Sequence, residues 1–388
     1  MLTLRWALCI GFLLRVAVAI WNGFWGPSLD AGADALGFHE SAVAQAANKE
    51  PWEWVGVGYI YSKTLGFLYT YITDALFFGS MLSVLMWVGS ALLLIGIMRL
   101  LSVNKSDQVK AMLIFALLPT SITYTSVTLR EAYQLCMVNL AVYSALKISM
   151  KKSLVHWIPL LASIPVMGVL HGALLAFGVL LVAGTLMLSA IGSRGIPLIK
   201  VALALPIAIL IFKYGVEIFV DIAYGTVEFG LTTAIQTFQE NSLVGDARAN
   251  YKENPEVPSL VSLIYFIPAG LFQYLFEPMP WRVAGAADIG LLAENILRAW
   301  LIWKALVALR DMPAIGRNPA LLVFISFVAI ETLWSLGTVN WGTAARHHLP
   351  SIGLLVASAY ACSRLMIKRN RTSQRLGTHR LPPSQSST

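Results

Sequence analysis

The stretch T-S-V-T-L-R-E-A-Y, residues 125–133, places an arginine and a glutamate side by side between two long apolar runs. The run before it is A-M-L-I-F-A-L-L-P-T-S-I, and the run after it is L-C-M-V-N-L-A-V-Y-S-A-L. Successive apolar runs of this kind predict helices that cross a membrane. We therefore expect Arg130 and Glu131 to lie at the tip of a tight helical hairpin, at the surface of the membrane.

The composition sets the class of protein. Of the 388 residues, 57% are hydrophobic and 12% are charged, and the mean hydropathy is +0.70. A soluble domain carries about 25% charged residues, and β-barrel strands would appear as short alternating segments. The expected fold class is all-α: a polytopic integral membrane protein with one transmembrane domain over residues 1–366 and a disordered basic tail over residues 367–388.

Hydropathy predicts about ten transmembrane helices. They are placed at residues 4–22, 79–100, 111–127, 132–148, 154–170, 173–191, 201–219, 291–309, 319–336 and 349–366. An even number of spans puts both termini on one side of the membrane. The basic tail and the basic connections fall on that side, and the positive-inside rule makes it the cytoplasm. The net charge of +8 follows from this topology, so no nucleic-acid partner is expected.

The same topology places most acidic residues outside, in the loops 23–78, 220–261 and 337–348, where short amphipathic helices are expected. The apolar segment 262–282 does not fit as a further crossing, because it would move the basic tail to the outer side. Its sequence Pro268-Ala269-Gly270 predicts a break, and hence a re-entrant or interfacial segment that packs on protein.

The first outer loop carries the candidate acids. Apolar residues recur at helical spacing after Asp34, which predicts a short helix on the membrane surface with Asp34 near its start. Asp30 and Asp34 would then face one cavity, with His39 and Glu40 one turn further along. One of the two aspartates is the candidate general base for a hydroxyl nucleophile. Helix capping and ordinary solvation are the structural alternative.

Arg130 is a candidate phosphate ligand, because a guanidinium can hold a phosphate with two hydrogen bonds. Glu131 would fix the position of the Arg130 side chain. The alternative is an interfacial ion pair that only caps two helix ends.

A second arginine, Arg346, follows the glycine- and threonine-rich stretch L-G-T-V-N-W-G-T-A-A-R-H-H-L-P, residues 336–350. With His347 and His348 it stands where the last helix is expected to begin, which suits an anion. Arg282, in F-E-P-M-P-W-R, is a further candidate saccharide contact. Snorkelling of Arg346 to the membrane surface is the structural alternative.

Metal chemistry is not indicated by the sequence. Neighbouring histidines on a helix do not face one ligand centre, and no third ligand accompanies His347 and His348. The three cysteines have no paired spacing, so neither a disulfide nor a thiolate metal site is expected. The sequence therefore specifies no cofactor, and a divalent metal is compatible with it but not indicated by it.

Taken together, the acidic first outer loop, L-R-E-A (129–132), F-E-P-M-P-W (276–281) and N-W-G-T-A-A-R-H-H (340–348) resemble bacterial polytopic proteins of surface-polysaccharide synthesis. The layout is similar to the GT-C class of integral-membrane glycosyltransferases and to O-antigen or exopolysaccharide polymerases. The chain differs from the best-known GT-C enzymes in having no soluble outer domain and no paired-acid signature in the first loop.

The resemblance implies a glycosyltransferase or polymerase in the bacterial inner membrane, with its active face outward. Its donor would be a polyprenyl-phosphate- or polyprenyl-diphosphate-linked saccharide, and its second substrate a saccharide acceptor. Asp34 or Asp30 would be the base, while Arg130 and Arg346 would stabilise the departing phosphate. In a polymerase, His347 or His348 would replace the aspartate as base.

A flippase for lipid-linked oligosaccharides, or another transporter, is the main alternative. Transporters commonly carry polar residues near the midplane of the membrane. Arg15, Lys213, Arg298 and Glu331 are candidate intramembrane charges of that kind. A structural subunit of an export complex is the third reading.

Overall fold

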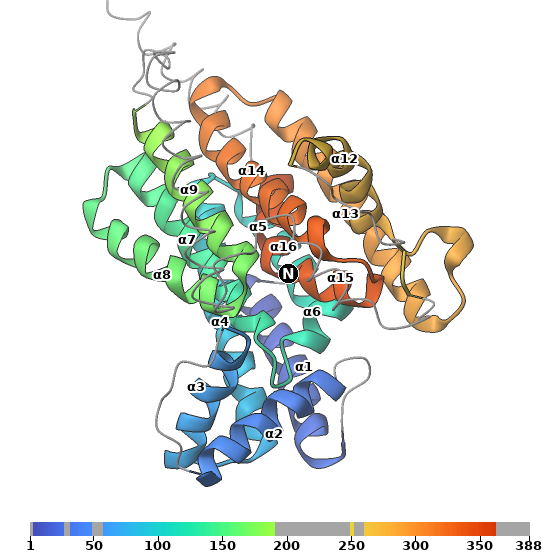
Figure 1. Ribbon diagram of the computed structural model, residues 1–388. Helices are drawn as coiled ribbons and strands as arrows, with labels where there is room; N and C mark the ends of the chain where they lie inside the picture. The colour runs from blue at the N-terminus through green and yellow to red at the C-terminus, as the bar shows by residue number, and fades with distance from the viewer. Residues whose placement is uncertain (1–2, 27–31, 49–56, 191–248, 252–259, 362–388) are drawn as a thin grey trace, which may run out of the picture.

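The computed structural model describes residues 3–26, 32–48, 57–190, 249–251 and 260–361 (Figure 1). Within these ranges every regular element is a helix, and an isolated antiparallel bridge joins Asn250 to Asn340. The helices are α1 (Leu4–Phe24), α2 (Gly32–Asn48), α3 (Val57–Tyr71), α4 (Leu76–Leu100), α5 (Lys105–Leu117), α6 (Pro119–Tyr124), α7 (Glu131–Lys151), α8 (Trp157–Leu170), α9 (Gly172–Ala190), α12 (Leu260–Phe276), α13 (Ala286–Arg310), α14 (Ala314–Gly337), α15 (Trp341–His347) and α16 (Leu349–Tyr360), with short 3-10 turns at Leu154–His156 and Pro280–Arg282.

Four of these helices are long and apolar enough to cross a membrane. They are Leu4–Phe24, Leu76–Leu100, Gly172–Ser189 and Gly316–Gly337. The expectation of an all-helical membrane protein is therefore confirmed. The number of ten spans stays a prediction, and the span at 201–219 and the tail at 367–388 lie outside the described residues.

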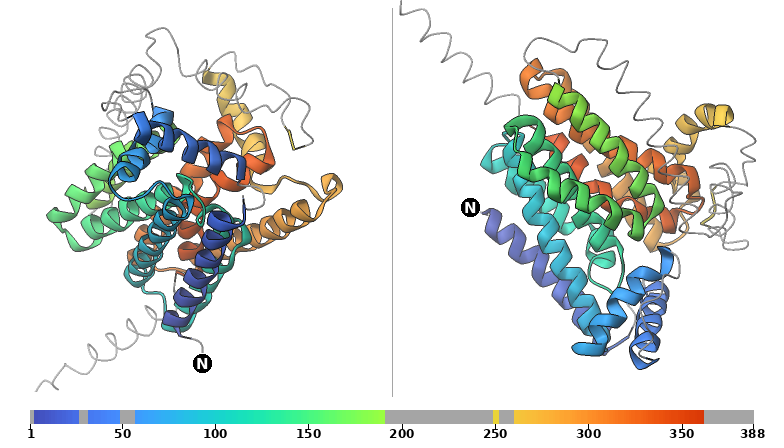
Figure 2. Two further views of the ribbon diagram at one scale, coloured as in Figure 1. Left: turned by 90° about the horizontal axis from the view of Figure 1, so that it is seen from below. Right: turned by 60° about the vertical axis from the view of Figure 1, so that its left-hand side comes forward.

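The helices form a bundle with two distinct ends, which the two views of Figure 2 show from below and from the side. The Arg130 end holds the turn 125–130, His171 and the loop 338–340. The Lys151 end holds the turns 101–104, 152–153 and 311–313. The hairpin of α2 and α3 lies at the Arg130 end, where Ala35 of α2 packs on the turn 125–130.

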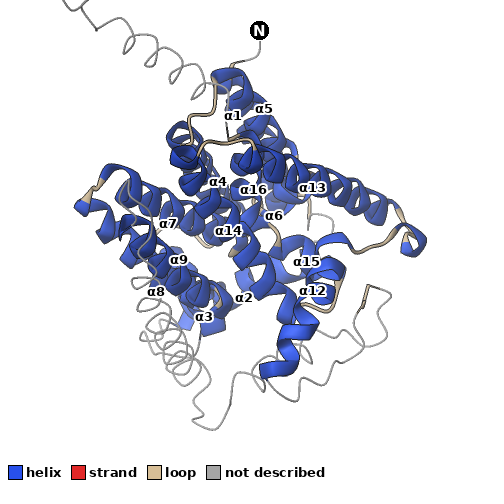
Figure 3. Cartoon of the chain, turned by 90° about the horizontal axis from the view of Figure 1, so that it is seen from above, coloured by secondary structure: helices blue, strands red, loops and turns tan. Residues whose placement is uncertain are grey.

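Helix α16 is the centre of the bundle, since all twelve of its residues are buried. It packs against α7, α13 and α14 (Figure 3). A Cβ atom at Gly353 would stand 3.2 Å from the amide of Asn139 on α7, so the glycine permits the close approach. Small residues at helix contacts are typical of membrane bundles, because packing rather than hydrophobic burial drives their association.

The span expected at 111–127 is not one helix, and this corrects the sequence prediction. Helix α5 ends at Leu117 and α6 begins at Pro119, with Leu118 in an extended conformation. The reason is that proline lacks an N–H group and disfavours a helical conformation in the residue before it. The freed backbone groups find other partners: the N–H of Thr120 donates to Glu294 of α13, and the carbonyl of Ala116 accepts from Arg15 of α1.

Arg15 is fully buried and holds the α5–α6 break against α1. Its guanidinium lies 3.7 Å from the ring centre of Trp87. Its hydrogen-bond acceptors are Thr125 Oγ1 at 2.7 Å, Ser121 Oγ at 2.8 Å, and the carbonyls of Ala116 at 2.9 Å and Gly11 at 3.0 Å. One side chain therefore fixes the segment that leads into the turn 125–130.

The break expected at Pro268-Ala269-Gly270 is also absent. Helix α12 continues through Pro268 as far as Phe276. Proline is tolerated inside membrane helices when neighbouring groups satisfy the backbone. Whether α12 crosses or re-enters the membrane stays a prediction.

We predict that Arg15→Leu destabilises the detergent-solubilised protein by about 2 kcal/mol or more, because it leaves the carbonyl of Ala116 buried without a donor. The change should appear as a lower midpoint of thermal unfolding. Arg5→Leu is the matched control, since Arg5 is an exposed arginine on the same helix. Equal midpoints for the two variants would show that Arg15 does not anchor the break.

Candidate functional site

Three charged side chains from distant parts of the sequence meet at the Arg130 end. Arg346 of α15 forms an ion pair with Asp34, in the first turn of α2. Glu131, at the start of α7, acts electrostatically on the same guanidinium. The side chain of Asp34 is 52% exposed and that of Arg346 20%, whereas Glu131 is 4% exposed. The charges thus alternate from the surface inward as negative, positive and negative.

The position of Arg346 is set by the capped helix α15. The side chain of Asn340 accepts hydrogen bonds from the N–H groups of Gly342 and Thr343, which is the usual device at a helix start. The segment 249–251 pairs with the residues before it: Tyr251 N–H donates to the carbonyl of Val339. The cap by Asn340 and the pairing with the segment 249–251 therefore hold the start of α15 in place.

The environment of Arg346 favours its charge. Burial alone would lower the pKa of this guanidinium, but Glu131 and then Asp34 outweigh burial and raise the pKa above its ordinary value. The arginine is a permanent cation between two carboxylates. Glu131 therefore stabilises Arg346, in contrast to the expectation that it would fix its sequence neighbour Arg130.

Arg130 lies beside Phe38 of α2, with 5.7 Å between its guanidinium carbon and the ring centre. It also lies close enough to His171 and His347 to act on them electrostatically. Burial first, and then Arg130, lower the pKa of His171 well below its ordinary value. Burial, then His171, Arg346 and Arg130, do the same for the pKa of His347. Both histidines are neutral at pH 7.

The two histidines pack on Trp334 of α14, His347 stacked on its ring and His171 tilted against it. The ring centre of Trp334 is 3.8 Å from that of His171 and 3.9 Å from that of His347. Nδ1 of His347 is 2.9 Å from the hydroxyl of Thr338. This packing places two neutral histidine side chains beside the charged groups of the site. Those charged groups are Arg130, Arg346, Asp34 and Glu131.

The other candidates are placed elsewhere. Nδ1 of His39 lies 2.9 Å from the hydroxyl of Tyr69 on α3, and Glu40 is exposed. His39 is therefore not directed at a cavity shared with Asp34. Arg282 pairs with Glu277 at 3.1 Å and donates a hydrogen bond to the carbonyl of Asn250. It therefore holds the segment 249–251, which lies beside α15, in place. Asp30 lies outside the described residues.

His348 diverges from His347 and joins a second polar cluster. Its Nδ1 lies 2.5 Å from Glu331 of α14, and Glu331 also accepts from Ser351. Nη1 of Arg298 donates to Asn295 and to the carbonyl of Leu275, both at 2.6 Å. His347 and His348 thus have separate partners.

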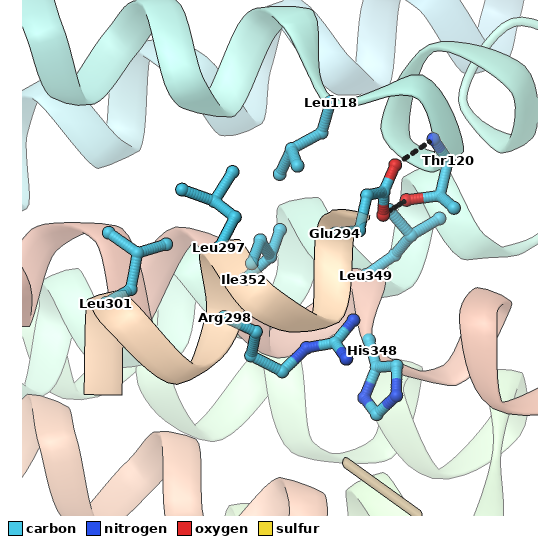
Figure 4. Close-up of a pocket in the computed structure, with 9 residues that line it drawn as sticks. All are labelled: Leu118, Thr120, Glu294, Leu297, Arg298, Leu301, His348, Leu349 and Ile352. Atoms are coloured by element: carbon cyan, nitrogen blue, oxygen red, sulfur yellow. Dashed lines mark hydrogen bonds between the residues drawn. The ribbon is translucent and has the colours of Figure 1, made fainter. Parts of the chain in front are cut away.

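A pocket opens beside this second cluster (Figure 4). It is lined by Leu118, Thr120, Glu294, Leu297, Arg298, Leu301, His348, Leu349 and Ile352, and it encloses about 300 Å³ of space, part of which is open to the surroundings. Glu294 is turned to Thr120, with hydrogen bonds of 2.9 and 2.6 Å. The enclosed part has room for about one water molecule, which is too little for a saccharide.

From the sequence, His171 and Gly172 are expected to form a turn between two helices, and neither Trp334 nor Gln134 stands out. His171 does lie between α8 and α9, as a turn residue would. The expected topology places His171 at the same end of the bundle as Arg130, and this is the signal that could have identified it. Among the described residues, no group of three His, Cys, Asp or Glu side chains is placed to hold a metal ion.

The chain was compared with family models, with curated proteins and with solved structures, and none of them matches. The fold alone therefore assigns the protein to a class, that of the helical membrane proteins. Its candidate site is a set of two arginines, two carboxylates and two neutral histidines at one end of the bundle.

We predict that stability falls below pH about 6.5, the ordinary pKa of histidine. His171 and His347 are neutral in the folded protein but take up protons in the unfolded chain, so their contribution is complete above that pH and is lost as the pH drops. Each should remove about 1.4 kcal/mol between pH 7.5 and 5.5. In His347→Gln this loss should be smaller by about 1.4 kcal/mol, measured by denaturant unfolding in detergent.

The control is His156→Gln, which changes a histidine at the Lys151 end and should keep the pH dependence of the wild type. If His347→Gln lost as much stability as the wild type over this pH range, His347 would not be held neutral by its surroundings.

Proposed function

We propose that this protein is an integral-membrane glycosyltransferase or polymerase of cell-surface polysaccharide synthesis in the bacterial inner membrane. It takes a polyprenyl-phosphate- or polyprenyl-diphosphate-linked saccharide as donor and a second saccharide as acceptor. The observation that carries the proposal is the convergence of Asp34, Glu131 and Arg346 beside Arg130 at one end of a membrane helix bundle.

The orientation of the bundle supports an outward-facing site. Lys105, Lys110, Lys147, Lys151, Lys152, Arg310 and Arg317 belong to the Lys151 end. By the positive-inside rule that end lies in the cytoplasm. The Arg130 end then faces outward, at the level where the head group of a polyprenyl-linked donor would be held.

The chemistry of the site fits a leaving phosphate. Arg130 and Arg346 supply two guanidinium groups, which bind phosphate oxygens through charge-assisted hydrogen bonds. Negative charge grows on the phosphate as the bond to the sugar breaks, so cations fixed in advance stabilise that transition state. The carboxylate of Asp34 already occupies a position on Arg346 that a phosphate oxygen would take. Binding of the donor would therefore exchange Asp34 for phosphate on Arg346.

Transport is the second candidate, and the second cluster is what favours it. Glu294, Arg298 and Glu331 are buried ionisable residues beside the breaks at Leu118 and His348, and discontinuous helices often form transport sites. However, both carboxylates are hydrogen-bonded within the chain, and the adjacent pocket is narrow. The Arg130 end is the better candidate for a saccharide substrate.

The first test is the length distribution of lipid-linked and surface glycans in a strain that lacks the gene. A repeat unit missing one sugar would identify a transferase, and single unpolymerised repeat units would identify a polymerase. We predict that Arg346→Lys reproduces the deletion in part, because lysine keeps the charge but loses the two-pronged contact. Arg310→Lys is the matched control, since Arg310 also pairs with an aspartate. Normal glycans in the deletion strain would overturn both enzyme activities and favour transport.

The second test measures binding of undecaprenyl phosphate to the purified protein in nanodiscs. We predict that Arg346→Lys weakens binding about tenfold, because one charge-assisted hydrogen bond is lost. Asp34→Asn should strengthen binding several-fold, because it removes the anion that competes for Arg346. Asp311→Asn is the matched control for Asp34→Asn, as both aspartates are exposed and paired with an arginine. Weaker binding in Asp34→Asn would contradict the exchange.

A further inference from the structure

Two buried acceptor oxygens on one face of α7 have no hydrogen-bond partner among the described residues. They are Oε2 of Glu131 and Oε1 of Gln134, in side chains that are 4% and 1% exposed. The two residues are three apart on the helix, so they lie on the same face. A buried polar group without a partner costs about 1–3 kcal/mol, and more if it is charged. Two such groups next to each other indicate a place that receives donors from outside the chain.

Within the described residues, no side chain donates a hydrogen bond to Oε2 of Glu131. The guanidinium of Arg346 acts on Glu131 as a charge and is itself bonded to Asp34. The hydroxyl of Tyr61 on α3 is within electrostatic range of Glu131, but it is turned to Ser83 and Tyr133. Nε2 of Gln134 is turned away toward the carbonyl of Leu170, at 3.4 Å. The two acceptor oxygens below Arg346 are therefore left without a donor in the described part of the chain.

This excess of acceptors selects the kind of ligand. A carboxylate and an amide oxygen repel a phosphate, which lacks donors in its ionised form. A sugar hydroxyl donates a hydrogen bond and carries no charge, so it matches them. The Arg130 end thus has two chemically different parts: Arg130 and Arg346 suit an anion, and Glu131 with Gln134 suits a hydroxyl group.

We propose that Glu131 is the catalytic base and that, together with Gln134, it binds the reacting hydroxyl of the acceptor saccharide. This inference rests on the proposed function. In the reaction, the hydroxyl gives its proton to Oε2 of Glu131 while its oxygen forms a bond to the anomeric carbon of the donor. The bond from that carbon to the phosphate oxygen breaks, and its electron pair leaves with the phosphate, which Arg130 and Arg346 hold.

Asp34 then has a different role from the one that the sequence suggested. Its carboxylate is engaged by Arg346 and lies nearer the surface than Glu131. Because Arg346 already engages its carboxylate, Asp34 is less available than Glu131 to take a proton in the reaction. Exchange of Asp34 for the phosphate of the donor would place Arg346 on the leaving group.

The test compares Glu131→Gln, Glu131→Asp and Gln134→Leu in the gene-deletion strain and as purified proteins. Glu131→Gln preserves the shape of the side chain but removes the charge that stabilises Arg346, so the thermal midpoint is measured alongside activity to separate loss of the fold from loss of the base. We expect it to reduce glycan formation by about 10²- to 10⁴-fold, the usual contribution of a general base. Binding of undecaprenyl phosphate should stay within about twofold of the wild type or become tighter.

Glu131→Asp keeps the carboxylate and should restore part of the activity. Undecaprenyl phosphate binding that is unchanged in Glu131→Gln then separates a base from a residue that only supports Arg346. Gln134→Leu should reduce glycan formation less than Glu131→Gln does, since it removes a contact and not the base. Full glycan formation in Glu131→Gln, with undecaprenyl phosphate still bound, would overturn this proposal and leave the proposed function intact; the unpartnered oxygens would then hold only a water molecule. Absence of undecaprenyl phosphate binding in the wild type, together with normal glycans in the deletion strain, would overturn the proposed function itself.

Discussion

Arg15 forms four hydrogen bonds from the middle of α1, and the arrangement of the Arg130 end depends on them. A guanidinium inside an apolar bundle is stable only if its donors are satisfied. One of the four acceptors, the carbonyl of Ala116, is available because Pro119 interrupts the helix. The arginine thus satisfies a group that the proline frees. The hydrogen bonds of Arg15 hold Ser121 and Thr125 against α1. The turn 125–130 that follows then packs against α2 and α15.

The Arg130 end keeps opposite charges close together at different depths. Asp34 is at the surface, Arg346 lies below it, and Glu131 is buried, so each charge has an opposite neighbour. Such a series is stable without a ligand, yet one oxygen of Glu131 has no hydrogen-bond partner within the described part of the chain. A buried polar group without a partner calls for an explanation, and a functional role is one such explanation. We therefore expect a substrate hydroxyl at the buried end of the series, at Glu131. At the surface end, an anion can compete with Asp34 for Arg346.

The sequence was sufficient to find these residues but not to pair them. Arg130, Glu131 and Arg346 stand out because charges next to apolar runs are rare, and Asp34 because it begins an amphipathic helix. Adjacency suggested that Glu131 serves Arg130, whereas the fold brings Arg346 to Glu131 from more than 200 residues away. The break at Pro119 was missed because hydropathy does not register a proline, and the break at Pro268 was wrong because helix packing can absorb one. The importance of His171 depends on tertiary contacts with Trp334, which no local pattern encodes.

His347 and His348 connect the two polar clusters. Consecutive residues on a helix point about 100° apart, so His347 packs on Trp334 while His348 turns to Glu331. Both partners lie three residues apart on α14, which therefore holds the junction of α15 and α16 from one face. Glu331 accepts a hydrogen bond from the hydroxyl of Ser351 in the first turn of α16, whereas Glu294 accepts from both the N–H and the hydroxyl of Thr120 at the start of α6. Glu294 therefore caps α6, and Glu331 joins His348 and α16 to α14. These structural roles account for the two buried carboxylates without a transport pathway. Through His348, Glu331 also fixes the C-terminal end of α15, so that Asp34 can leave Arg346 while Arg346 stays in place.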